Sequence, residues 1–139
     1  MKLLSATTWV CGQRGLEYAR AQGYRQVVAS SGEMANIVAI VGELGIANYF
    51  DALLSGAFLP RSKPDPTLFL QAAATVGAAP GACLVIEDGI VGIEAARRAG
   101  MPSVAVTTSH PADKLAQAHL VVARLADVAP DVIERLLEA

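Results

Sequence analysis

Residues 85–101 read VIEDGIVGIEAARRAGM, and this stretch decides the fold of the chain. It begins inside an apolar run, ACLVIED at residues 82–88, which is typical of a parallel strand buried on both faces. A helical pattern follows from about Ile90 to Ala99 and ends at a glycine, and SVAVTT at residues 103–108 favours another strand. Strand, helix and strand in direct succession predict a βαβ unit of a parallel sheet.

The same alternation runs through the rest of the chain. Apolar periodicity, closing glycines and short β-branched runs predict helices at residues 13–22, 33–44, 66–76, 112–118 and 127–137, and strands at residues 26–30, 52–56 and 120–123. Asp65 is expected to cap the helix that opens with Pro66. Residues 1–139 therefore predict a single α/β domain, a Rossmann-like, doubly wound parallel sheet in three α/β/α layers.

Composition excludes several classes of partner. The apolar runs are broken well before the roughly 18 residues that a membrane span needs, so no membrane partner is expected. A net charge of −2 without a basic run argues against nucleic acid. The first residues lack the form of a secretory leader, which predicts a cytoplasmic chain. Cys11 and Cys83 show neither zinc-ligand nor disulfide spacing and are expected to be reduced structural thiols.

Three polar features lie at the expected carboxyl ends of strands, where doubly wound sheets bind ligands. Ser30 and Ser31 end one strand, Lys63 lies in RSKPDPTLF after the next, and Glu87 and Asp88 end the apolar run. Each feature also has an ordinary structural interpretation. The serines can form a turn and helix cap, the lysine can be a solvated loop charge, and the aspartate before a glycine can make a turn or cap the next helix.

Taken together, the three features are more specific. Mg²⁺ is commonly held by one or two carboxylates together with phosphate oxygens of the substrate. A lysine beside them would neutralise a phosphoryl group or a carboxylate nucleophile, and a hydroxyl with backbone N–H groups would bind the remaining phosphate oxygens. The combination predicts a magnesium-dependent phosphoryl-transfer site for a small phosphorylated molecule, with one part missing.

The order of VVASS, RSKPDP and VIEDGIVGIEAARRAGM resembles the haloacid dehalogenase superfamily, in its branch of phosphoglycolate-phosphatase-like and β-phosphoglucomutase-like enzymes. The resemblance covers roughly Gly15 to Thr108, and the segment after the acidic pair is its most specific part. It implies a phosphatase or phosphomutase type of hydrolase. It implies no particular substrate, because in this branch a separate cap domain supplies much of the specificity.

The resemblance also implies a role for each polar residue. Ser30 would contact the transferring phosphoryl group, with Ser31 beside it in the phosphate site. Lys63 would stabilise the nucleophile and the phosphoryl charge. Glu87 and Asp88 would hold Mg²⁺.

Two departures from the family pattern follow. Gly89 stands where a serine or threonine is common after the acidic pair, which puts a minor hydrogen bond in doubt. The larger departure is at the start of the family pattern. Family members begin with a strand that ends in Asp-x-Asp, whose first aspartate is the nucleophile, and a helical cap domain follows. These 139 residues contain no Asp-x-Asp, so the chain is expected to be truncated and inactive or nearly so by itself.

The missing strand lies centrally in this family, and its absence would leave buried strand edges unpaired, which is costly. Lys2 to Val10, KLLSATTWV, is the best candidate to fill the position, in its own subunit or exchanged in a homodimer. The alternative is that residues 1–12 are only a linker and the chain is a fragment.

Three functional hypotheses remain open at this point. The chain is the core of a magnesium-dependent phosphatase or phosphomutase, a catalytically inactive module that binds phosphate and Mg²⁺, or a subunit whose nucleophile strand comes from another polypeptide.

Overall fold

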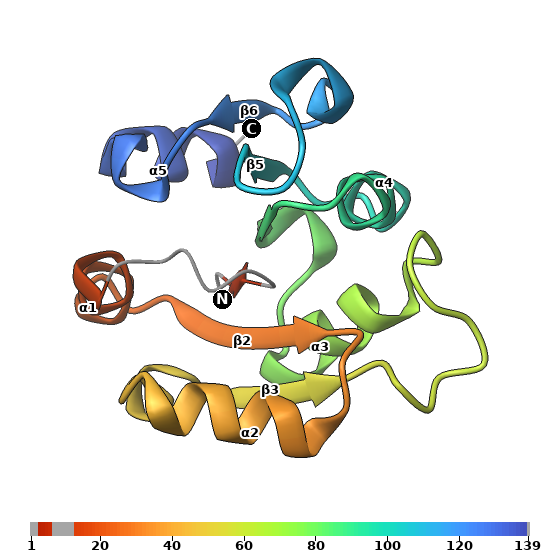
Figure 1. The fold of residues 1–139 in the computed structure, drawn as a ribbon. Helices are drawn as coiled ribbons and strands as arrows, with labels where there is room; N and C mark the ends of the chain where they lie inside the picture. Colours follow the sequence, from red (N-terminus) through yellow and green to blue (C-terminus); the bar gives the residue numbers. More distant parts are fainter. Residues whose placement is uncertain (1–2, 7–12, 139) are drawn as a thin grey trace.

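The sheet has six parallel strands in the order β3-β2-β1-β4-β5-β6 (Figure 1). The computed structural model describes residues 3–6 and 13–138. Within these residues the strands are β1 Leu3–Ala6, β2 Arg25–Ser30, β3 Ala52–Ser55, β4 Cys83–Glu87, β5 Ser103–Val106 and β6 Leu120–Val122. The order is that of a Rossmann-type doubly wound sheet.

Helices cover both faces of the sheet. They are α1 Gln13–Ala21, α2 Met34–Glu43, α3 Thr67–Val76, α4 Ile90–Arg98 and α5 Pro130–Glu138. Side chains of α3 and α4 form one core cluster with β2 and β4, whereas α1, α2 and α5 contribute to the clusters on the other face. The predicted three-layer α/β/α fold is therefore confirmed.

The central strands explain why the apolar runs were so continuous. Every residue of β4 and β5 is buried. Alternate side chains serve opposite layers, so that Val85 packs in the cluster with α3 and α4, whereas Leu84 and Ile86 pack in the cluster with α5. Full burial of one such side chain stabilises the fold by about 1.5–3 kcal/mol. These strands are the main core of the domain.

Cys83 belongs to this core. Burial raises the pKa of its thiol to about 11, and its Sγ donates a hydrogen bond to the carbonyl of Ala79 at 3.2 Å. The thiol is therefore protonated at neutral pH, in agreement with a reduced structural role. Cys11 lies outside the described residues.

Two predicted helices differ from the structure. Residues 112–118 form only a short 3₁₀ helix, η3 Ala112–Leu115, because Leu115 is the single large apolar side chain that this segment buries. The last helix begins at Pro130 instead of Asp127, since Leu125–Asp127 forms its own 3₁₀ turn, η4, and a proline is tolerated in the first turn of a helix.

The start of α3 differs by one residue from the prediction. The helix begins at Thr67, and Pro66 occupies the N-cap position. Asp65 still performs the predicted capping function, because its Oδ1 accepts a hydrogen bond from the backbone N–H of Thr67 at 2.9 Å. The bond from the Thr67 hydroxyl, and then this backbone bond, hold the pKa of the Asp65 carboxyl below its usual value.

β1 occupies the centre of the sheet. Leu4 lies opposite Gln26 of β2 on one side and opposite Leu84 of β4 on the other. The position between β2 and β4, which the sequence left to be filled, is therefore taken by Leu3–Ala6 of the same chain. The remaining part of the predicted strand, residues 7–10, lies outside the described residues.

Within the described residues, no helix has both the length and the apolar composition needed to cross a membrane.

Candidate active site

The strand order reverses between β1 and β4, and in doubly wound sheets ligands bind beyond the carboxyl ends of the strands at such a point. Glu87 ends β4 there, and Ser30 ends β2 on the far side of β1. The segment of residues 56–66 extends beyond the carboxyl ends of β2 and β3 and carries Lys63 (Figure 1). The polar residues that the sequence singled out thus share one edge of the sheet.

Lys63 and Glu87 form a buried ion pair. Lys63 Nζ lies 3.2 Å from Glu87 Oε2, and the two side chains are only 8% and 7% exposed. The ammonium also donates a hydrogen bond to the carbonyl of Ala29 at 3.3 Å and lies 4.8 Å from the centroid of the Phe69 ring. A buried charge without such partners is very costly. The ordinary interpretation of Lys63 as a solvated loop charge is therefore wrong.

Glu87 has partners on its other oxygen as well. Its Oε1 accepts hydrogen bonds from the backbone N–H groups of Asp88 and Gly89, each at 3.1 Å. These amides lead into α4, whose N-terminus favours a negative charge. The carboxylate of Glu87 is thus held between the start of α4 and the ammonium of Lys63.

Gly92 makes this placement of Glu87 possible. A Cβ atom at residue 92 would lie 2.1 Å from Glu87 Cδ and 2.2 Å from its Oε2, distances that real Cβ atoms do not show. The side chain of Glu87 therefore lies directly on the first turn of α4, where only a glycine leaves room for it.

Asp88 is the more accessible carboxylate of the pair. It is partly exposed, and its Oδ2 accepts a hydrogen bond from the hydroxyl of Ser109 at 2.6 Å. Gly89 occupies the N-cap position of α4, and this N-cap makes no side-chain hydrogen bond. Asp88 is therefore directed to a residue of the next loop and does not cap the helix.

The serines have a local role in the described structure. Ser30 Oγ accepts a hydrogen bond from the backbone N–H of Gly32 at 3.1 Å, and the Ser30 carbonyl accepts one from Gly56 at 2.7 Å. Ser31 is exposed beside them. The described contacts thus bring Lys63 to Glu87, whereas Ser30 forms its own turn at the end of β2.

These residues fit Mg²⁺ in chemical kind. The cation prefers hard oxygen ligands and usually takes one or two carboxylates together with phosphate oxygens and water. Within the described residues no group of three or more histidine, cysteine, aspartate or glutamate side chains could hold a metal. Asp88 offers an accessible carboxylate, and Glu87 lies next to it with both oxygens in hydrogen bonds. The pair would supply part of a coordination shell that substrate and water complete.

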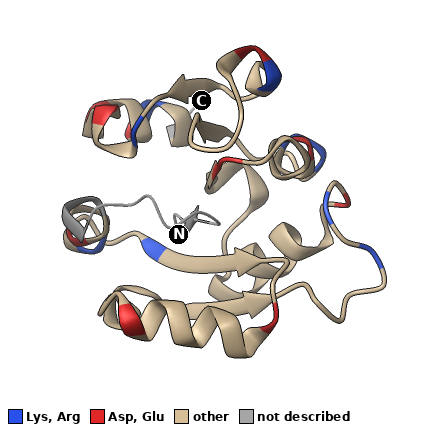
Figure 2. Cartoon of the chain, viewed as in Figure 1, with Lys and Arg blue, Asp and Glu red and all other residues tan. Residues whose placement is uncertain are grey.

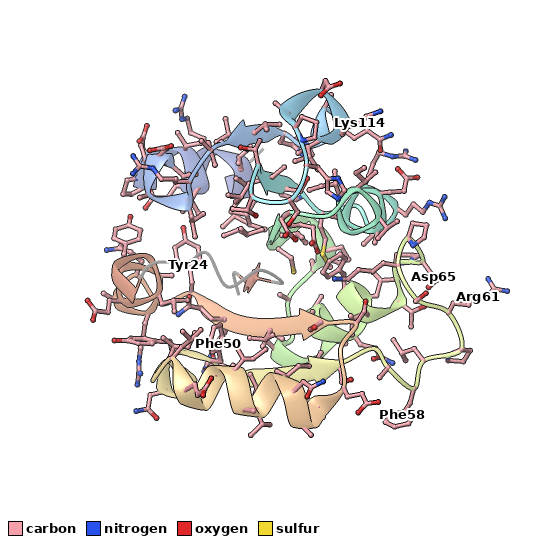
Figure 3. The ribbon with its side chains drawn as sticks, viewed as in Figure 1. Tyr24, Phe50, Phe58, Arg61, Asp65 and Lys114 are labelled. Carbon is pink, nitrogen blue, oxygen red and sulfur yellow. The ribbon has the colours of Figure 1, made fainter. Side chains whose placement is uncertain are left out.

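The segment of residues 56–66 also carries charged and aromatic residues. Figure 2 shows basic and acidic residues along the outer bend of the segment that carries Lys63. Phe58 and Arg61 extend outward from it (Figure 3), and Phe58 is 92% exposed. Arg61 Nη1 lies 3.9 Å from Asp65 Oδ2. The outer part of this segment therefore exposes an aromatic and a basic side chain.

The structure adds residues that the sequence analysis did not identify. Ser109, Gly92 and Phe69 all contact the acidic residues or Lys63 directly, or make room for them. A signal for Ser109 was present, because TTS follows the SVAV strand at the same carboxyl edge. Gly92 gave no such signal, since the need for glycine depends on where another side chain folds back.

Known proteins with similar sequences include phosphatases and phosphomutases. The chain is 37% identical over 93 residues to a phosphoglycolate phosphatase of Nitrosococcus oceani, covering 67% of this chain and 41% of that protein. It is 36% identical over 98 residues to a β-phosphoglucomutase of Bacillus subtilis, covering 70% of this chain and 42% of that protein. The chain spans less than half the length of these curated relatives.

A solved structure shows a similar fold. The crystal structure of a β-phosphoglucomutase from Clostridium difficile superimposes with a TM-score of 0.79 at 27% identity, covering 88% of this chain and 53% of that one. Residues 13–100 match the haloacid dehalogenase-like hydrolases. With this match over more than half of its residues, and with the buried lysine and acidic pair at the switch point of the sheet, the chain belongs to the haloacid dehalogenase-like hydrolase family.

Proposed function

We propose that this chain is the core of a magnesium-dependent enzyme that transfers a phosphoryl group from a small phosphorylated molecule. The observation that carries the proposal is the buried pair of Lys63 and Glu87 beside the partly exposed Asp88. A buried ammonium at the ligand-binding edge of a sheet is costly unless its charge is used or balanced. Phosphoryl transfer relies on positioned charge of this kind.

Each residue has a distinct role in the proposal. Lys63 stabilises negative charge on the phosphoryl group, and Glu87 fixes the position of that ammonium. Asp88 would hold the metal directly, with Glu87 next to it. The Ser30 hydroxyl and the backbone N–H groups after it would bind phosphate oxygens. When bound, Mg²⁺ would supply further positive charge to the phosphoryl oxygens.

The covalent step is the part that these residues do not provide. The 139 residues contain no Asp-x-Asp, and neither Lys63 nor Ser30 has the activation that a nucleophile needs in the described contacts. We therefore expect this chain by itself to bind the metal without turning over substrate. The alternatives, a binding module without catalysis and a site completed by another polypeptide, start from the same observation.

The test combines activity with metal binding. Hydrolysis of an aryl phosphate in the presence of Mg²⁺ and binding of Mn²⁺, followed by electron paramagnetic resonance, are measured on purified chain of confirmed intact mass. Asp88→Asn is compared with Glu43→Gln, an exposed carboxylate at the end of α2. We expect no turnover by any variant, and Mn²⁺ affinity that falls at least about ten-fold in Asp88→Asn only.

Either half of the proposal can fail. Turnover that Asp88→Asn abolishes would support the metal site but would show that a nucleophile is present among these residues. Equal Mn²⁺ binding by Asp88→Asn and the wild-type chain would contradict the metal site.

A further inference from the structure

We propose that Ser109 is a positioning residue that fixes the carboxylate of Asp88 for metal binding. The inference rests on the proposed function, because it assigns a partner to the residue that would hold Mg²⁺. Ser109 donates a hydrogen bond to Asp88, and the role inferred for it acts through the position of that carboxylate.

The contact between the two residues has the form of a strong hydrogen bond. Ser109 Oγ lies 2.6 Å from Asp88 Oδ2, within the range of about 2.5–2.7 Å that is usual for a hydroxyl donating to a carboxylate. With one oxygen engaged, the side-chain torsions of Asp88 are restricted. A metal ligand that is restricted in this way loses less conformational freedom when the metal binds.

The sheet brings the two residues together. Asp88 follows β4, Ser109 follows β5, and Glu87 of β4 lies opposite Ala105 of β5. The loop that carries Ser109 is attached at its start, because the backbone N–H of Thr107 donates to the carbonyl of Val122 in β6 at 3.0 Å. Ser109 therefore reaches Asp88 from a fixed neighbouring strand.

A purely structural role does not account for the hydroxyl. Helix η3 begins at Ala112 with Pro111 in the N-cap position, so Ser109 does not cap it. Both Ser109 and its neighbour Thr108 are exposed, and burial therefore gives no separate reason for a hydroxyl at residue 109. Its hydroxyl instead donates to Asp88, the accessible carboxylate of the candidate site.

Hydrogen bonds to metal-binding carboxylates have a known effect on affinity. Loss of such an outer partner typically costs about 10–100-fold in metal affinity. For Ser109, whose bond lies in a partly exposed place, we expect a loss near the lower end, roughly ten-fold. The carboxylate itself would remain, and binding would be weakened without being abolished.

The experiment titrates Mn²⁺ against the full chain by electron paramagnetic resonance and records the thermal unfolding midpoint of each variant. Ser109→Ala removes the hydroxyl, Ser109→Thr retains it, and Thr108→Ala removes the adjacent hydroxyl as a matched control. We expect a roughly ten-fold loss of Mn²⁺ affinity in Ser109→Ala alone, with near wild-type affinity in the other two and similar midpoints in all.

The outcomes separate this inference from the proposed function. If Asp88→Asn weakens Mn²⁺ binding but Ser109→Ala does not, the positioning role is overturned and the metal site stands. If the wild-type chain binds Mn²⁺ no better than Asp88→Asn, the proposed metal site fails and this inference fails with it. If Thr108→Ala is as harmful as Ser109→Ala, or Ser109→Thr does not restore affinity, the hydroxyl has no specific role toward Asp88.

Discussion

Gly92 shows how strongly a single residue is constrained at the candidate site. We predict that Gly92→Ala destabilises the chain by about 3 kcal/mol, because the new Cβ would displace Glu87 from the start of α4 and disturb its buried partner Lys63. Helix propensity alone would give the opposite sign, since alanine is better than glycine inside a helix by about 1 kcal/mol. Urea unfolding followed by circular dichroism measures the difference.

Gly42→Ala is the matched control for this prediction. Gly42 also lies in a helix, α2, and a Cβ there would meet nothing within 4 Å. We expect this variant to be more stable than the wild-type chain by about 0.5–1 kcal/mol. If both substitutions stabilise the chain, then Glu87 is not held against Gly92 as described.

At the level of residues, sequence alone predicted where the candidate site residues lie better than it predicted their contacts. Lys63, Glu87 and Asp88 could be found because strand ends in a parallel sheet converge on one edge. The sequence could not show that Glu87 would be tied to the lysine and to two backbone amides while Asp88 stays accessible. This difference between Glu87 and Asp88 depends on the conformation of the Glu87 side chain, which the periodicity of the sequence does not predict.

At the level of elements, α4 has a charged cluster on its outer side. Arg97 and Arg98 donate hydrogen bonds to Glu94 at 2.7–3.0 Å. The bonds from Arg97 and then Arg98 lower the pKa of the Glu94 carboxyl to about 2, from an ordinary value of 4.5. The same contact raises the pKa of Arg97. The cluster is therefore charged throughout the physiological pH range.

This cluster predicts a pH dependence of stability with a defined sign. Because the folded-state pKa of Glu94 is depressed, its contribution is complete above about pH 4.5 and is lost as the pH falls toward about 2. The free energy of unfolding of Glu94→Gln should therefore be lower than that of the wild-type chain above pH 4.5, and the two values should converge toward pH 2. Chemical unfolding at a series of pH values measures this difference.

The arginines provide the control for the Glu94 prediction. Replacing both Arg97 and Arg98 by glutamine removes the partners that lower the pKa, so the double variant should be less stable than the wild-type chain above about pH 4.5, and this difference should shrink as the pH falls toward about 2. Added salt should reduce the effect, because the cluster is exposed. A difference between Glu94→Gln and wild type that stays constant down to pH 2 would contradict this account.

Helices and strands were predicted more accurately where they bury more of the core. β4 and β5, which are buried at every position, stood out as apolar runs, and the helices that cover them followed from periodicity. The segment after residue 111 was predicted as a longer helix than the structure has, because its alanines favour a helix in isolation. With Leu115 as its only large buried side chain, tertiary packing supports just one 3₁₀ turn there.

At the level of the whole molecule, the fold depends on β1. This strand of four residues pairs with β2 on one side and with β4 on the other, so it joins the two halves of the sheet. Sequence analysis could predict that something must fill this central position, because buried strand edges are costly. It could not decide whether the strand comes from the same chain, since both arrangements form the same hydrogen bonds.

The last prediction addresses β1 directly. Leu4→Pro removes a backbone N–H in the middle of the central strand, where proline is not tolerated, and should prevent cooperative folding. Leu4→Val, which keeps the N–H and suits a strand, should fold like the wild-type chain. Urea unfolding followed by circular dichroism distinguishes the two, and cooperative folding of Leu4→Pro would mean that β1 is dispensable.

Light scattering of the wild-type chain then identifies the source of the strand: a mass of 14.4 kDa is expected when β1 pairs within its own chain, whereas twice that mass would indicate exchange between two copies.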